Sequence, residues 1–158
     1  MARASDEPHR VALLGYGLAG AVFHAPLIET TPGLRLVAVV TSAPGRQEQA
    51  RGRHPEARVL GRVDDVWEGE GKADLVVFAT PNRTHVPLGL AAIGAGLAVV
   101  VDRPLALTAA EARRLIAVAA KRRVPLTVFQ NRRQGDPPVG GRLSVAPHTP
   151  PLAMAQVW

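Results

Sequence analysis

The sequence predicts an α/β fold of the doubly wound type, in which a parallel β-sheet lies between two layers of helices. Short, almost wholly apolar segments at 11–14, 75–79 and 97–101 are typical of strands that are buried on both faces. Segments with a helical period separate these strands, and a glycine-rich turn directly follows the first of them. This alternation predicts right-handed βαβ units and the strand order 3-2-1-4-5-6.

The elements follow one another regularly along the chain. We expect strands at 11–14, 34–40, 58–60, 75–79, 97–101 and 126–129. Helices are expected from about residue 18, over 46–53, 62–68 and 83–94, and after residue 108. Pro26 should divide the first helix, because proline is tolerated only in the first turn of a helix. Thr108 and Glu111 have capping-box spacing. The buried stripe of the last helix is predicted to contain Ala112, Leu115, Ile116 and Ala119.

The chain is expected to form one folded domain over residues 10–130. Residues 1–9 are polar and predict a flexible N-terminus. Residues 131–158 contain five prolines and three glycines without any helical or strand period, which predicts an irregular tail.

Composition excludes several classes of protein. Hydrophobic residues make up 47% and charged residues 20%, as in soluble globular proteins. The absence of cysteine excludes disulfides and thiolate metal sites, and we expect no metal. No apolar run can span a bilayer and the first ten residues lack a secretory pattern, so a cytoplasmic protein without a membrane partner is expected. The net charge of +6 is spread along the chain with few aromatic residues, which disfavours nucleic acid as a partner.

The turn after the first strand carries the pattern G-x-G-x-x-G. Gly15 permits a tight turn, Gly17 lets a pyrophosphate approach the backbone, and Gly20 allows close packing of helix on strand. The N-terminus of the following helix favours anions. A Rossmann-type dinucleotide site is therefore predicted here, with a ligand-free glycine turn as the alternative. Its first cofactor-binding residues are Gly15, Tyr16, Gly17, Leu18, Ala19 and Gly20.

The end of the second strand bears on the choice between NAD and NADP. NAD sites usually place an acidic residue there to bind the ribose 2′-hydroxyl. This chain has Thr41 and Ser42 instead, and Arg46 is close enough to meet a 2′-phosphate. We interpret the pattern as favouring NADP and leave NAD open. The alternative is that Arg46 is only a solvent-exposed loop residue.

Four ordered segments carry a further signal: Gly15–Ile28 (GYGLAGAVFHAPLI), Ala79–His85 (ATPNRTH), Val101–Pro104 (VDRP) and Val128–Arg133 (VFQNRR). Together they resemble the Gfo/Idh/MocA oxidoreductases over residues 10–133, in particular a branch that includes NADP-linked scyllo-inositol dehydrogenases. The resemblance implies that Thr80, Pro81, Asn82 and His85 lie along the nicotinamide half of the cofactor. It places Asp102, Arg103 and Pro104 where the family has Glu-Lys-Pro.

Several of these residues have a structural alternative. Asn82 is as consistent with capping the next helix as with touching the cofactor. His85 is a catalytic candidate, but a first-turn histidine bonded to the backbone is the favoured interpretation. For His24 we favour a satisfied polar residue over one in the cofactor crevice. Pro104 is a candidate for a cis peptide bond.

Two departures from the family put independent catalysis in doubt. Arg103, the other catalytic candidate, stands at the position of the family's lysine, and arginine is a poor proton shuttle because it stays protonated. The family continues with a substrate domain that carries further catalytic groups, whereas this chain stops at Trp158. We therefore expect an α/β chain of three αβα layers without its substrate domain.

The sequence leads to one leading function and two alternatives. The leading interpretation is the NAD(P)-binding domain of a sugar or polyol oxidoreductase, which transfers hydride between NADP and a carbinol carbon but is incomplete for catalysis alone. A non-catalytic dinucleotide-binding module is the first alternative. A basic interaction or nucleic-acid-binding protein is the second. The uncovered side of the last strand, at Leu126, Val128 and Phe129, would also allow a homo-oligomer.

Overall fold

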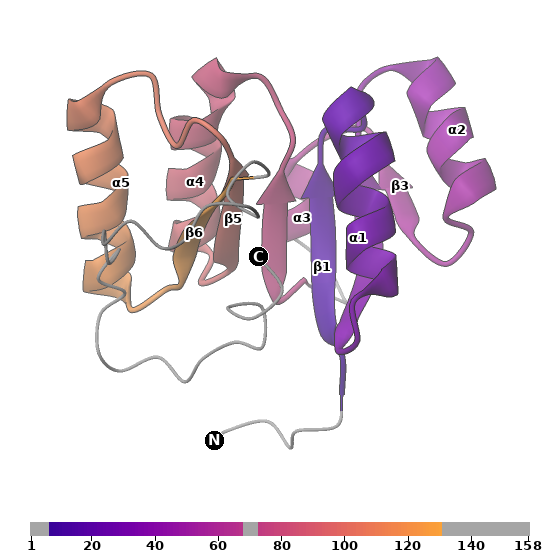
Figure 1. Ribbon diagram of the computed structural model, residues 1–158, viewed down its shortest axis with the longest axis horizontal. Coiled ribbons are helices and arrows are strands. Elements are labelled where there is room, and N and C mark those ends of the chain that lie inside the picture. Colours follow the sequence, from indigo (N-terminus) through magenta and orange to yellow (C-terminus); the bar gives the residue numbers. More distant parts are fainter. Residues whose placement is uncertain (1–6, 68–72, 131–158) are drawn as a thin grey trace, which may run out of the picture.

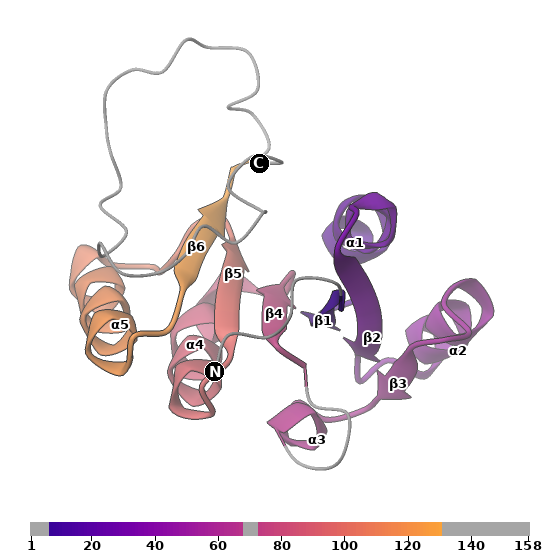
Figure 2. The ribbon, with the colours of Figure 1, turned by 90° about the horizontal axis from the view of Figure 1, so that it is seen from below.

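The computed structural model describes residues 7–67 and 73–130. Six strands form one parallel sheet (Figure 1), in the order β3-β2-β1-β4-β5-β6 that was predicted (Figure 2). Their bounds are β1 His9–Leu14, β2 Leu34–Val40, β3 Arg58–Leu60, β4 Leu75–Phe78, β5 Ala98–Asp102 and β6 Leu126–Phe129. The expected tail, residues 131–158, and the last residues of the VFQNRR segment lie outside the described residues.

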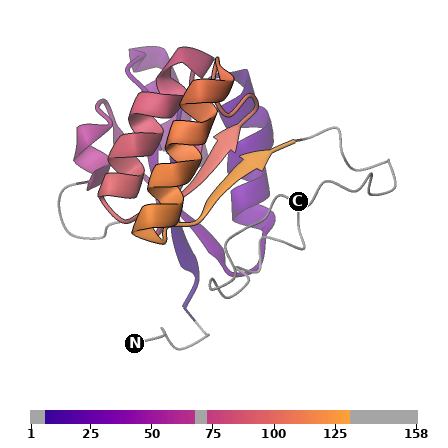
Figure 3. The same cartoon turned by 90° about the vertical axis from the view of Figure 1, so that its left-hand side faces the viewer.

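Helical segments connect successive strands. They are η1 Ala19–His24, α1 Ala25–Thr30, α2 Pro44–Arg53, α3 Asp64–Trp67, η2 Asn82–Thr84, α4 His85–Gly94 and α5 Ala109–Arg122. Figure 2 shows α3, α4 and α5 on one side of the sheet and α1 on the other, while Figure 3 shows α4 and α5 in front of β5 and β6. None of the helices in the described ranges is long and apolar enough to cross a membrane.

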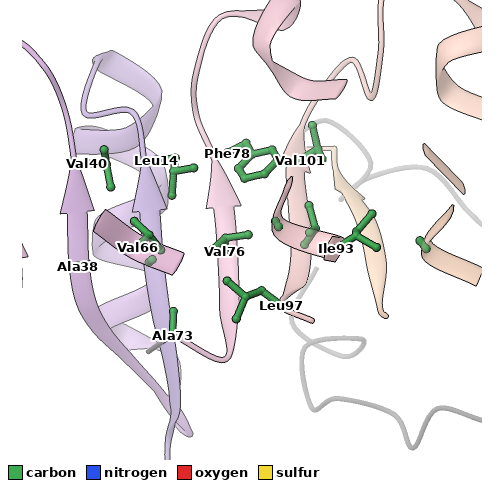
Figure 4. Close-up of a cluster of buried hydrophobic side chains, with 14 of the residues drawn as sticks. Leu14, Ala38, Val40, Val66, Ala73, Val76, Phe78, Ile93, Leu97 and Val101 are labelled. Atoms are coloured by element: carbon green, nitrogen blue, oxygen red, sulfur yellow. The ribbon is translucent and has the colours of Figure 1, made fainter. Parts of the chain in front are cut away.

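The sheet is apolar on both faces because alternate residues of each strand pack against different helix layers. In β1, Ala12 and Leu14 belong to the core beneath α3, α4 and α5, together with Val66, Ile93 and Leu115. Figure 4 shows Leu14, Val66 and Ile93 in this core. Val11 and Leu13 belong to the second core, together with Ile28 of α1 and Ala50 of α2. Burial on both faces explains why the strands are continuous apolar runs rather than alternating patterns.

Local sequence signals account for the helix boundaries. The first helix is divided as expected: a π-helix, η1, runs to His24, and Pro26 lies in the first turn of α1. The capping box of α5 is confirmed by bonds in both directions between Thr108 and Glu111. The predicted buried stripe was wrong at Ile116, which is 46% exposed. Because α5 lies at the edge of the sheet, only the narrow side that carries Leu115 and Ala119 is covered.

Parallel pairing brings the candidate segments to one edge of the sheet. The turns after β1, β2, β4 and β5 all begin at carboxyl ends of strands. The chain runs from β1 outward to β2 and β3, then returns to β4 on the other side of β1. This reversal between β1 and β4 is the topological switch point at which open α/β sheets bind ligands.

Candidate functional site

The glycine loop packs directly against the end of β4. Gly15 has a φ of +94°, and a Cβ on it would overlap the carbonyl oxygen of Ala79. A Cβ on Gly20 would overlap the carbonyl oxygen of Gly15, so the turn tolerates no side chain at either position. Two backbone bonds hold this arrangement: Gly15 N–H donates to Val40 O at 2.9 Å, and Ala79 N–H donates to Leu14 O at 2.8 Å.

Gly17 differs from the other two glycines because its surroundings are open. Among the described atoms, a Cβ placed there would have only Arg46 Nη1 within 4 Å, at 3.8 Å. Leu18, the N-cap of η1, is 76% exposed and makes no side-chain capping bond. The backbone at Gly17 and the first turn of η1 is therefore open to the approach of a phosphate.

Tyr16 points away from this open side. Its side chain is buried, and its hydroxyl lies 2.8 Å from Nε2 of His54 at the end of α2. Nδ1 of His54 in turn lies 2.6 Å from Glu29 Oε1. Burial raises the pKa of Tyr16. Tyr16 was predicted to bind the cofactor, and only its backbone is available for that contact.

The segment after β2 places the guanidinium of Arg46 beside the glycine loop. Thr41 is buried, with its N–H on Leu60 O at 3.0 Å and its carbonyl oxygen accepting from Gln47 at 2.8 Å. Ser42 and Arg46 are exposed. Arg46 is not a loop residue, because it lies in the first turn of α2, and its guanidinium is the group that approaches Gly17.

The turn after β4 is held by Thr84 rather than by Asn82. The Thr84 hydroxyl lies 2.8 Å from Thr80 Oγ1 and 2.7 Å from Pro81 O. Asn82 is exposed and makes no capping bond, so the capping interpretation was wrong. Thr84 is the N-cap residue of α4 and also makes no side-chain capping bond, because its hydroxyl reaches back across the single 3₁₀ turn to Thr80 and Pro81. Pro81 and Asn82 are exposed at the carboxyl edge of the sheet, directly after β4.

His85 has a structural position. Its ring is fully buried, with Nδ1 2.8 Å from Pro104 O and Nε2 3.0 Å from Thr80 O. It therefore ties the turn after β4 to the turn after β5, as a first-turn histidine bonded to the backbone. The alternative of catalysis by His85 does not fit, because both ring nitrogens face backbone carbonyls and no ring atom faces the crevice.

The turn after β5 forms one wall of a cavity of about 460 Å³. The Asp102 carboxylate accepts the Arg103 N–H at 2.9 Å through Oδ1, and the Arg103–Pro104 peptide bond is cis as expected. Arg103 is exposed. The cavity is lined by Ala19, Phe23, His24, Asp102, Arg103, Pro104 and Phe129.

His24 is the feature that sequence reasoning misjudged. It comes from η1, is 1% exposed, and has no hydrogen-bond partner for Nε2 within the described part of the chain. Asp102 Oδ2 lies 3.5 Å from this nitrogen, and the Phe129 ring packs edge-on at a centroid distance of 4.9 Å. Burial lowers the pKa of His24, against the opposing effect of the Asp102 carboxylate. The expectation of a satisfied polar residue was wrong, because the groups that face His24 come from β5 and β6, far along the chain.

Comparisons with known proteins agree with this arrangement. A family model described as "Oxidoreductase family, NAD-binding Rossmann fold" matches residues 9–130. The uncharacterized oxidoreductase YdgJ of Escherichia coli is 43% identical over 124 residues, which cover 78% of this chain and 35% of that protein. The scyllo-inositol 2-dehydrogenase (NADP(+)) IolW of Bacillus subtilis is 34% identical over 124 residues, which cover 78% of this chain and 34% of that protein.

A solved structure shows the same fold with a dinucleotide. The crystal structure of GenD2 from gentamicin A biosynthesis, in complex with NAD, is 33% identical. It superposes with a TM-score of 0.72 over 81% of this chain and 36% of that one. The chain thus spans about a third of the length of its relatives. It belongs to the Gfo/Idh/MocA oxidoreductase family and carries that family's NAD-binding Rossmann fold.

Proposed function

We propose that this chain binds NADP(H) along the carboxyl edge of its sheet and is the cofactor-binding part of a dehydrogenase for sugars or polyols. The observation that carries the proposal is the contrast among the three glycines. Two of them are sterically required by the turn itself, whereas Gly17 has open space that the fold does not need. A backbone left open at this place suits the approach of a pyrophosphate.

The residues present fit the dinucleotide along its whole length. The backbone of residues 15–20 would hold the pyrophosphate, and Thr41, Ser42 and Arg46 would hold the adenosine ribose. Thr80, Pro81, Asn82, Asp102 and Arg103 border the crevice where the nicotinamide half would lie. When bound, the dinucleotide supplies hydride chemistry, and the chain supplies its position and exclusion of water.

The preference for NADP over NAD rests on charge. No carboxylate lies between the end of β2 and Arg46 to bind a ribose 2′-hydroxyl, and the exposed Arg46 guanidinium lies beside the glycine loop. Arginine binds phosphate through several N–H groups at once. The name of the IolW relative specifies NADP(+), while the GenD2 structure contains NAD, so the family relationship alone does not decide between them.

The substrate class follows from relatives rather than from this chain alone. IolW is named as acting on scyllo-inositol, and the cavity at Asp102 and Arg103 is polar enough to receive a hydroxylated ligand. Arg103 is exposed and stays protonated, so it can orient a hydroxyl but not exchange its proton. We propose that a complete catalytic site needs groups beyond those described here. A module that binds the dinucleotide without turnover is the second candidate, because Arg103 occupies the lysine position.

A calorimetric titration of the chain with NADPH and with NADH tests the proposal. Saturable binding with NADPH preferred is expected, and Arg46→Ala should reduce that preference while leaving NADH binding nearly unchanged. Binding of neither dinucleotide, by a chain whose circular dichroism shows it folded, would contradict the proposal. Turnover with polyols but not with other alcohols would separate the dehydrogenase from the binding module.

A further inference from the structure

His24 and Asp102 form an imidazole–carboxylate pair in the lining of the cavity. The two residues come from different parts of the chain, and His24 Nε2 lies 3.5 Å from Asp102 Oδ2. Both residues line the cavity, and with the histidine side chain 2% exposed and the aspartate side chain 26%, the carboxylate is the more accessible of the two. Buried polar side-chain atoms are normally hydrogen-bonded, and an unsatisfied one therefore calls for an explanation.

Few charged groups surround this pair. Of the cavity-lining residues, only His24, Asp102 and Arg103 carry ionisable groups. Asp102 ends β5 and Arg103 begins the turn after it, whereas β6 contributes the uncharged ring of Phe129. The other η1 residues in the lining, Ala19 and Phe23, are apolar. Arg103 does not release its proton, and an isolated carboxylate is a weak base. An imidazole is the one of these groups that titrates near neutral pH.

We propose that His24 and Asp102 act together as the proton-exchanging pair of the site, a role that rests on the proposed function. Asp102 accepts a hydrogen bond from a ligand hydroxyl, and the hydroxyl proton passes through its carboxylate to Nε2 of His24. The O–H bond breaks and an N–H bond forms. The oxygen keeps the electron pair and shares it with carbon as the carbonyl forms, while that carbon gives up hydride to an oxidised nicotinamide dinucleotide.

The geometry suits such a pair in both charge states. Neutral His24 matches the apolar contact with the Phe129 ring. Protonated His24 would face the carboxylate 3.5 Å away, and the ion pair would offset the cost of a buried cation. Of the two residues, Asp102 would contact the ligand hydroxyl and is the catalytic residue. His24 acts through Asp102 and is a positioning residue.

Nuclear magnetic resonance of the histidine rings tests the pair directly. The ¹⁵N-labelled chain is titrated with acid, and His24 is assigned by His24→Gln. Asp102→Asn keeps the shape of the aspartate but removes its charge, and it should lower the pKa of His24 by about 1. His54, whose two ring nitrogens already face Tyr16 and Glu29, is the internal control and should not respond. An unchanged His24 titration in Asp102→Asn would overturn the inference.

Ligand titrations connect the pair to the site. Addition of NADP⁺ and then millimolar myo-inositol should shift the His24 resonances in the unaltered chain and not in Asp102→Asn. If the chain binds NADPH by calorimetry but the His24 resonances do not shift with either ligand, this inference is overturned and the proposed function stands. Absence of dinucleotide binding would overturn the proposed function, and the catalytic step with it, even where Asp102→Asn still shifts the pKa of His24.

Discussion

Gly17→Ala should separate ligand binding from stability. The new methyl group would have one described atom within 4 Å, the flexible end of Arg46 at 3.8 Å, which is ordinary van der Waals contact. Gly17 also lacks the left-handed backbone conformation of Gly15. The free energy of unfolding should therefore change by less than about 1 kcal/mol.

The same methyl group would occupy the approach of a phosphate. A backbone N–H and a phosphate oxygen need a heavy-atom distance of about 2.9 Å, and a methyl carbon keeps other atoms at about 3.5 Å. Loss of one hydrogen bond to a charged group costs about 1.5–3 kcal/mol. The Kd for NADPH should therefore rise roughly tenfold to a hundredfold.

Two other glycines make matched controls. Gly20→Ala would drive its methyl group into the Gly15 carbonyl oxygen, so stability should fall by about 1–3 kcal/mol or more, together with binding. Gly94→Ala, in the last position of α4, meets nothing within 4 Å and should leave binding unchanged. Urea unfolding and calorimetry are measured for all three variants. Wild-type affinity in Gly17→Ala would refute the placement of the pyrophosphate, and unfolding equal to that of Gly20→Ala would refute the steric reasoning.

Three further outcomes can be measured on the same chain. Arg46→Glu should weaken NADPH binding at least tenfold and NADH binding much less, since it removes a charge-assisted bond of about 1.5–3 kcal/mol to phosphate; equal loss for both would show that Arg46 does not meet the 2′-phosphate. Leu115→Ala should cost about 2–5 kcal/mol in urea unfolding, because Leu115 is fully buried against α4; a cost below about 1 kcal/mol would mean that α5 is loosely packed. Stability should fall as pH drops below the ordinary histidine pKa of 6.5, because the pKa of His24 is lowered on folding and the unfolded chain then binds more protons. His24→Gln should make the urea midpoint less dependent on pH between pH 5 and 7. An unchanged dependence would contradict the lowered pKa.

Much of the fold could be predicted because its signals are local. Burial on both faces makes each parallel strand a continuous apolar run, so five of the six strands were found within one residue of their ends, and only the start of β1 was placed two residues late. The capping box of α5 and the break at Pro26 depend on residues only a few positions apart. Once the strands are known to be parallel, Gly15, Thr41, Thr80 and Asp102 must lie at the carboxyl edge of the sheet.

The directions of individual side chains were decided by the tertiary structure. Whether Tyr16 faces a ligand depends on His54, 38 residues away. The environment of His24 depends on Asp102 and Phe129, which reach it only when β5 and β6 complete the sheet. The chain's own pattern therefore determined its fold class, its glycine turn and the edge that carries the candidate site. Only packing between distant segments decided which polar groups are satisfied, because burial and hydrogen bonding are properties of the assembled neighbours and not of the local sequence.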